Sequence, residues 1–126
     1  MTRKRVVTVY SEDEKDAIRA QKDRPQARQR CPVCGALGIR RYYSMVEGRT
    51  RPAIASLAWC PGCHTYTGST GPALGRVVTT DPVKEDPNAP KDSGSQAAMD
   101  EYLSFLDRLW DAGRLPQRIV HRNVGS

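Results

Sequence analysis

Residues 31–64 read CPVCGALGIRRYYSMVEGRTRPAIASLAWCPGCH and contain every cysteine of the 126-residue chain. The cysteines form two C-x-x-C turns that are separated by 25 residues: Cys31 with Cys34, and Cys60 with Cys63. Two residues between cysteines let one tight turn present both thiolates to a metal ion, and zinc prefers four such ligands in structural sites. The pattern therefore predicts one structural zinc ion per chain, bound by these four cysteines.

Two strand-like segments connect the cysteine turns. Residues 39–46 (IRRYYSMV) and 52–59 (PAIASLAW) are joined by five residues that include Gly48, which predicts an antiparallel β-hairpin. Such a hairpin brings both cysteine turns to the same end of a small sheet. Residues 74–80 (LGRVVTT) are a candidate third strand. One face of the second strand is wholly apolar and should be covered by another element; it carries Ala53, Ala55, Leu57 and Trp59.

Both cysteine turns contain residues that suit a tight backbone. Pro32 and Pro61 each follow the first cysteine of a turn and preset the backbone there. We expect Gly35 and Gly62 to adopt positive φ angles, where the chain must leave or round the metal.

A strand and a helix are predicted before the first cysteine turn. Residues 5–10 (RVVTVY) are strand-like, and Ser11 with Glu14 has the form of a capping box. A helix should therefore begin at about Glu12 and end near Asp23, before Pro25. Its few apolar residues favour a loosely docked surface element.

An amphipathic helix is predicted near the C-terminus, ending near Ala112 before Gly113. Its apolar stripe should cover the apolar strand face and comprises Met99, Tyr102, Leu103, Leu106, Leu109 and Trp110. We therefore expect a single α+β domain with a sheet of two or three antiparallel strands. Its parts are a basic N-terminal extension (1–30), the cysteine-bearing sheet (31–80), a proline-rich linker (81–95), the C-terminal helix (96–113) and a tail (114–126).

The order CPVCG, β-hairpin, CPGCH resembles the zinc ribbon superfamily of metal-stapled β-hairpins. The resemblance covers residues 31–64, with His64 standing where Gly35 stands in the first turn. It implies one structural zinc bound by four cysteines. It also implies binding roles in transcription, translation, DNA handling or protein assembly more often than catalysis.

The cysteine pattern is also compatible with other chemistries. Cys60, Cys63 and His64 have the form of a c-type haem attachment site, with His121, Met45 or Met99 as a second axial ligand. Haem would leave the first turn unexplained, and a thiol redox centre would need only one pair. Disulfides are rare in a reducing compartment. His64 could replace a cysteine as a metal ligand, but four thiolates already complete the shell, which favours a surface or outer-shell histidine.

The sequence predicts a non-enzymatic cytoplasmic protein. Four cysteines would close the zinc shell, whereas a catalytic zinc keeps an open position. Glu47 is the only acid between Asp23 and Asp81, so the metal has no obvious general base nearby. The first thirty residues contain no apolar signal region, and the chain has no twenty-residue apolar span. We expect neither a membrane nor a small-molecule substrate as a partner.

Nucleic acid is the preferred partner because the net charge is +6 and would stay at about +4 with bound zinc. Arginines bind phosphates and tyrosines stack on bases, and the hairpin offers Arg40, Arg41, Tyr42, Tyr43, Arg49 and Arg51. The tyrosines could instead pair across the sheet, with the arginines as its solvated face. The alternative function is a protein-binding adaptor or an immunity-type inhibitor that docks on a cognate protein.

Overall fold

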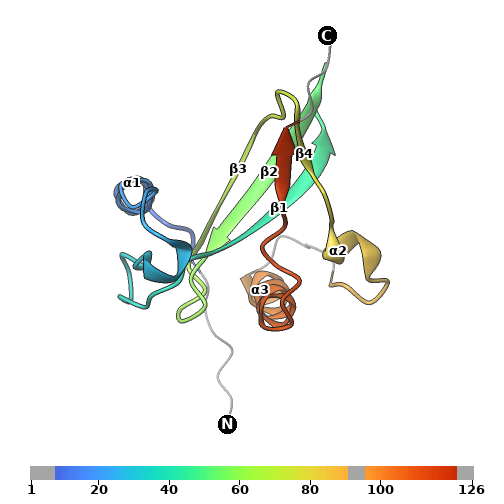
Figure 1. Ribbon diagram of the computed structural model, residues 1–126. Helices are drawn as coiled ribbons and strands as arrows, with labels where there is room; N and C mark the ends of the chain where they lie inside the picture. Colours follow the sequence, from blue (N-terminus) through green and yellow to red (C-terminus); the bar gives the residue numbers. More distant parts are fainter. Residues whose placement is uncertain (1–7, 91–95, 122–126) are drawn as a thin grey trace.

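The computed structural model describes residues 8–90 and 96–121 of the chain (Figure 1). The main sheet is antiparallel, with strands in the order β1 (Arg40–Glu47), β2 (Pro52–Trp59) and β3 (Tyr66–Pro72). A second antiparallel sheet pairs β4 (Arg76–Val78) with β5 (Ile119–His121).

The helices are α1 (Glu12–Arg19), α2 (Pro82–Glu85) and α3 (Gln96–Asp111), with a 3-10 turn, η1, at Gln26–Arg28. None of the helices within the described ranges has the length and apolar character needed to cross a membrane. The arrangement confirms the predicted α+β class with a C-terminal helix.

The β1–β2 hairpin agrees with the prediction to within one residue at each end. Arg40 pairs with Trp59, and Tyr42 pairs with Leu57. Because successive side chains of a strand point to opposite faces, β1 presents alternate residues to the two sides of the sheet. The cysteine turns come just before β1 and just after β2, so they meet at the same end of the sheet, as expected.

The third strand of the main sheet differs from the prediction. β3 begins two residues after the His64 turn and pairs along β2, so that Leu57 faces Gly68 and Ser56 faces Ser69. The strand consists mainly of Gly, Ser and Thr residues, so no apolar alternation marks it in the sequence. The candidate segment 74–80 does contain a strand, but this strand pairs with β5, in the segment expected to be a tail.

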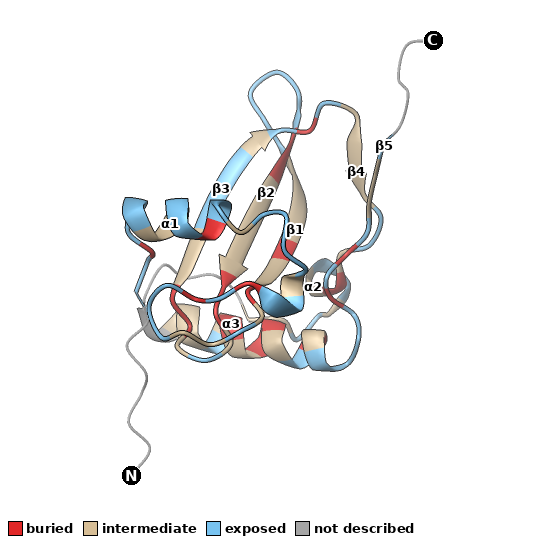
Figure 2. Cartoon of the chain, turned by 60° about the vertical axis from the view of Figure 1, so that its left-hand side comes forward, coloured by how far each residue is buried: buried red, intermediate tan, exposed pale blue. Residues whose placement is uncertain are grey.

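Helix α3 covers the face of the sheet that carries Tyr42 and Trp59. Leu103 and Leu106 are fully buried and belong to one cluster with these two aromatic residues. Buried residues gather where α3 meets the lower end of the sheet (Figure 2). The predicted stripe therefore packs on the apolar strand face as expected. Trp110 is only partly buried and meets Trp59 edge to face, with ring centroids 6.3 Å apart.

Helix α1 begins at the predicted capping box. The Ser11 side chain accepts from the Glu14 backbone N–H, and the Glu14 side chain accepts from the Ser11 backbone N–H. The helix ends at Arg19, four residues earlier than expected, and the chain continues in turns. Of the predicted strand at residues 5–10, residues 5–7 lie outside the described part of the chain. Val9 forms an isolated parallel bridge to Tyr66.

The segment predicted as an extended linker is partly built into the fold. Asp81 caps α2 by accepting from the backbone N–H groups of Val83 and Lys84, and Pro82 is fully buried. The Tyr42 hydroxyl donates to Asp81 Oδ1 at 2.6 Å, which ties α2 to the main sheet. Residues 91–95 of this segment lie outside the described residues. Buried apolar contacts at Pro82 explain why proline content alone misjudged this stretch.

Candidate metal centre and basic surfaces

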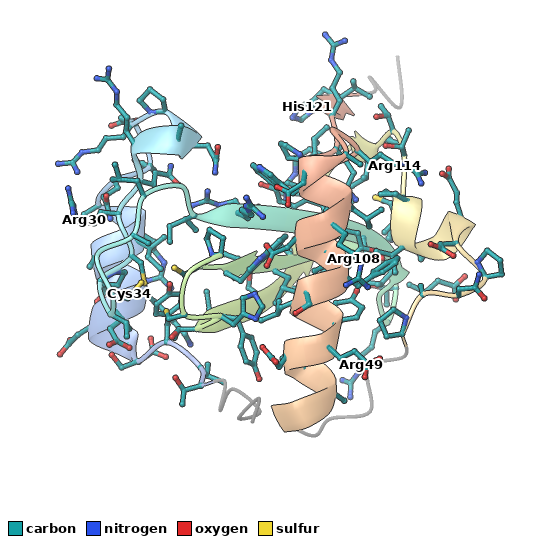
Figure 3. The ribbon with its side chains drawn as sticks, turned by 90° about the horizontal axis from the view of Figure 1, so that it is seen from below. Arg30, Cys34, Arg49, Arg108, Arg114 and His121 are labelled. Carbon is teal, nitrogen blue, oxygen red and sulfur yellow. The ribbon has the colours of Figure 1, made fainter. Side chains whose placement is uncertain are left out.

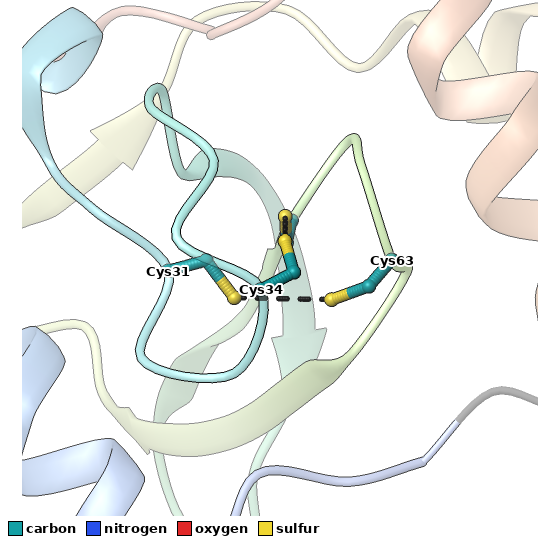
Figure 4. Close-up of side chains that lie close together, drawn as sticks. Cys31, Cys34 and Cys63 are labelled. Carbon is teal, nitrogen blue, oxygen red and sulfur yellow. Dashed lines mark hydrogen bonds between the residues drawn. The ribbon is translucent and has the colours of Figure 1, made fainter.

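Four cysteine sulfurs form a cluster at one end of the main sheet (Figure 4). All four Sγ atoms lie within 4.8 Å of one another, and no disulfide joins them. The Sγ–Sγ distance is 3.8 Å for Cys31 and Cys63 and 3.5 Å for Cys34 and Cys60. Four sulfurs at about 2.3 Å from a tetrahedral zinc ion would be about 3.8 Å apart. The residues present therefore fit one ion, and the cluster is compatible with a zinc-binding knot.

The two cysteine turns have matching backbone hydrogen bonds. In the first turn, the Gly35 N–H donates to the Cys31 carbonyl, and in the second the His64 N–H donates to the Cys60 carbonyl, both at 2.9 Å. Backbone N–H groups also point at the first sulfur of each turn, from Val33 at 3.4 Å and from Gly62 at 3.3 Å. N–H groups aimed at sulfur stabilise the thiolate form that a metal ion requires.

Positive φ angles occur at Gly35 (+77°) and at His64 (+57°). The expectation for Gly62 was therefore wrong, because the left-handed residue of the second turn stands one place after Cys63, as Gly35 follows Cys34. Close packing favours glycine at position 62 for another reason. A Cβ atom there would lie 3.2 Å from the Ala36 Cβ atom, so the two turns touch at this point.

Two hydroxyl groups contact the cluster from outside. The Tyr10 hydroxyl lies 2.9 Å from Cys31 Sγ, and the Thr65 hydroxyl lies 3.1 Å from Cys63 Sγ. Burial raises the pKa of Tyr10, so its hydroxyl stays protonated and can donate to the sulfur. Sequence reasoning missed both residues, although Thr65 stands two places after a cysteine and could have been proposed from that spacing.

The protein alone does not make all four thiols acidic. Burial opposes ionisation of Cys31, but hydrogen bonds, with that of Tyr10 the largest, lower its pKa to about 7. Burial raises the pKa of Cys60 and Cys63, and neighbouring thiols of the cluster add to the effect. A divalent cation removes this mutual repulsion and holds its ligands as thiolates. A bound metal ion would therefore be needed to hold all four cysteines as thiolates.

His64 connects the second cysteine turn to α3. Its side chain is buried, with Nδ1 2.7 Å from Asp100 Oδ1 and Nε2 2.7 Å from Asp107 Oδ2. Carboxylate oxygens only accept hydrogen bonds, so two carboxylate neighbours favour a ring that carries a proton on both nitrogens. The expected outer-shell role fits this geometry better than a surface position does. Asp100 and Asp107 were missed, although a spacing of seven residues puts both on one side of a helix.

Asp107 is the centre of a larger polar network. Its Oδ1 accepts from Arg40 Nη1 at 2.7 Å and from Trp59 Nε1 at 2.9 Å. Burial opposes ionisation of this carboxyl group, but hydrogen bonds from His64, Trp59 and Arg40 outweigh burial and lower its pKa. Arg40 also reaches Asp111 at 3.3 Å and lies over the Trp110 ring. The network therefore fixes α3 to the first residue of β1 and the last residue of β2.

The predicted nucleic-acid residues do not form one surface. Arg40 and Tyr42 point to the side covered by α3, where Arg40 is paired with Asp107 and Tyr42 is only 6% exposed. Tyr42 therefore cannot stack on a base in this conformation. The other four residues of the prediction lie elsewhere: Arg41 and Tyr43 on the opposite face beside α1, and Arg49 and Arg51 in the exposed turn between β1 and β2.

No known protein family, curated protein or solved structure matches this chain. The geometry of the four cysteines and the charges around the sheet therefore carry the functional argument.

Proposed function

We propose that this chain is a non-enzymatic, zinc-ribbon-type protein that binds nucleic acid through the basic side chains of its hairpin. In this proposal Cys31, Cys34, Cys60 and Cys63 hold one zinc ion, which supplies a structural cross-link between the two turns. The sulfur distances and the matching turns support the metal assignment. Four thiolates leave a tetrahedral ion no open position for a substrate, which supports a structural role.

The surroundings of the cluster also favour a structural role. His64 is 4% exposed, and both of its ring nitrogens face carboxylates. A histidine in this position can orient the second turn against α3, but a substrate would not reach it. General acid–base catalysis needs a group within hydrogen-bond reach of the reacting atoms.

The nucleic-acid proposal depends on which hairpin arginines are paired with carboxylates. Arg40 has carboxylate partners, whereas no carboxylate of the described chain lies within 4.0 Å of the guanidinium groups of Arg41, Arg49 and Arg51. Arg49 and Arg51 are exposed and line a depression at the tip of the hairpin. Unneutralised arginines keep their full charge for phosphate groups, whose counterions are released on binding.

Elemental analysis and a salt titration test the two parts of the proposal. Purified protein should contain about one zinc per chain. Affinity for nucleic acid should fall steeply with salt, and the double variant Arg49→Gln/Arg51→Gln should reduce the slope of log K against log salt by about 1.5. Arg108→Gln removes a charge from α3 and is the matched control.

Recovery of a different metal would contradict the zinc assignment. Recovery of a single stoichiometric protein partner that survives nuclease treatment, without nucleic-acid binding at low salt, would contradict nucleic-acid binding. It would favour the alternative of an adaptor or an immunity-type inhibitor.

A further inference from the structure

A basic groove lies between α1 and the face of the main sheet that α3 leaves uncovered. It encloses about 300 Å³, and α1 supplies Lys15 and Arg19 to its wall. The sheet supplies Arg41 and Tyr43 from β1, with Ser56 and Ser69 on the floor. The two serine hydroxyls lie 2.9 Å apart across β2 and β3. Among the residues that the structure describes, the lining therefore combines three cations, hydroxyl groups and one aromatic ring, without a carboxylate.

Arg41 is held in position by a neutral group. Its Nη1 donates to Gln29 Oε1 at 2.6 Å, and Gln29 is only 5% exposed. The Gln29 amide is oriented in turn, because its Nε2 donates to the carbonyl oxygens of Gln21 and Arg24. An arginine bound to an amide keeps its whole positive charge and retains further N–H donors for an anion. This arrangement distinguishes Arg41 from Arg40, which is neutralised by Asp107.

The two cations of α1 are paired only weakly. Lys15 lies 3.1 Å from Glu12, and Arg19 lies 2.7 Å from Asp16, each within one helical turn. The carboxylate side chains of these pairs are 81% and 66% exposed. Ion pairs whose carboxylate is exposed to solvent contribute little, so both cations can turn toward a phosphate group in the groove.

Tyr43 has a fixed backbone and a partly buried side chain that lines the groove. The Tyr43 N–H donates to Gln117 Oε1 at 3.1 Å, and Gln117 Nε2 donates to the Tyr43 carbonyl. The Gln117 side chain thus takes the place of a neighbouring strand at this position of β1. A ring held in this way offers a stacking surface beside Arg41, and binding a base would cost little conformational entropy at this residue.

We propose that this groove binds one nucleotide unit of a single-stranded nucleic acid. Arg41, with Lys15 and Arg19, contacts the phosphate, and the base stacks on Tyr43. The inference rests on the proposed nucleic-acid function and names the strand type and the site. A base in a duplex has both faces covered by its neighbours, whereas an unpaired base is free to stack on an aromatic side chain. The volume of the groove suits one nucleotide rather than a double helix.

Fluorescence anisotropy of the zinc-loaded full chain tests the groove. The probes are a labelled twelve-residue oligothymidylate and a duplex of the same length, and thymidine monophosphate serves as the competitor. We expect tighter binding of the single strand than of the duplex. Tyr43→Leu should weaken single-strand binding about tenfold or more, and Tyr43→Phe, which keeps the ring, should stay within about twofold. Arg41→Gln should weaken binding and lower the salt slope by about 0.7.

Arg108→Gln is the matched control, because Arg108 lies on α3, apart from α1 and its groove (Figure 3). Unchanged single-strand affinity in Tyr43→Leu and Arg41→Gln, with a loss only in Arg49→Gln/Arg51→Gln, would overturn the groove and leave the proposed function standing. Absence of binding by the wild-type chain to either oligonucleotide would overturn both. Saturable binding of the monophosphate without binding of the oligonucleotide would mean that the groove takes a free nucleotide, and this result would overturn the proposal.

Discussion

Replacing Asp107 by alanine should produce one of the largest losses of stability available outside the cysteines. The side chain lies on α3 and is 20% exposed. It accepts hydrogen bonds from Arg40 and Trp59 and also meets His64 at 2.7 Å. The substitution removes the carboxylate that joins these three donors.

The magnitude follows from what the three donors lose. Trp59 is fully buried, so its indole N–H would have no water to replace the carboxylate, at a cost of about 1–3 kcal/mol. Arg40 and His64 would lose this carboxylate and keep their contacts to Asp111 and Asp100. Removing one member of a fully buried ion pair typically costs about 3–5 kcal/mol, but the Arg40 and Asp107 side chains are 18% and 20% exposed and both cations keep another carboxylate, so the total here should be about 2–3 kcal/mol. We expect Asp107→Ala to lower the free energy of unfolding by this amount.

Asp111→Ala is the matched control for this experiment. Asp111 stands one helical turn later and binds the same arginine at 3.3 Å, but its side chain is 71% exposed. An exposed ion pair contributes about 1 kcal/mol or less. Urea titrations of the zinc-loaded proteins, followed by tryptophan fluorescence and far-ultraviolet circular dichroism, measure both changes with the same slope against urea.

Two results would refute the reasoning about Asp107. An effect of Asp107→Ala below about 1 kcal/mol would mean that the three donors find other acceptors. Equal effects of Asp107→Ala and Asp111→Ala would mean that helix propensity or net charge, rather than burial, determines the loss.

Three further results are expected. Chelating the metal, or Cys60→Ser, should unfold the cysteine turns together with the packing of α3 and shift tryptophan emission to longer wavelength, since Trp59 precedes that ligand; an unchanged spectrum after verified metal removal would contradict this. Leu106→Ala should lower the free energy of unfolding by about 2–5 kcal/mol, whereas Leu74→Ala, at a residue 67% exposed, should change it by less than about 0.5 kcal/mol in the same urea titration. Tyr10→Phe should weaken zinc binding about tenfold in competition with a chromophoric chelator, because it deletes the hydroxyl that contacts a ligand sulfur; equal affinities would exclude that role.

The cysteine cluster and the hairpin could be predicted because each depends on local pattern. The spacing within each C-x-x-C turn sets which sulfurs one turn can present, and the hairpin between the turns sets where the two turns meet. The α3 stripe was equally accessible, because spacings of three and four place residues on one face whatever they pack against. For Leu103 and Leu106 that face became the core.

The accessibility of the proposed binding residues could not be predicted as well, because it depends on which face of the sheet α3 covers. Arg40 and Tyr42 lie beside Arg41 and Tyr43 in the sequence but on opposite sides of the sheet. Only the packing of α3 decides that the first two become internal and the last two remain accessible. β3 escaped prediction for a different reason. Its Gly, Ser and Thr residues form a strand through backbone pairing to β2, and that pairing leaves no signature in side-chain hydrophobicity.

The polar network around His64 also changes what the metal can be expected to stabilise. Most of the buried apolar residues fall into two clusters, one around Tyr10 and the cysteines and one beneath α3. Trp59 belongs to the second cluster, whereas the adjoining Cys60 belongs to the first. His64 adds a second connection, because its backbone closes the Cys60 turn while its ring contacts two carboxylates of α3. If the second turn loses its shape without metal, these contacts to α3 are lost with it. Metal binding should therefore stabilise the packing of α3 as well as the cysteine turns, so that the domain unfolds as one cooperative unit rather than in two steps.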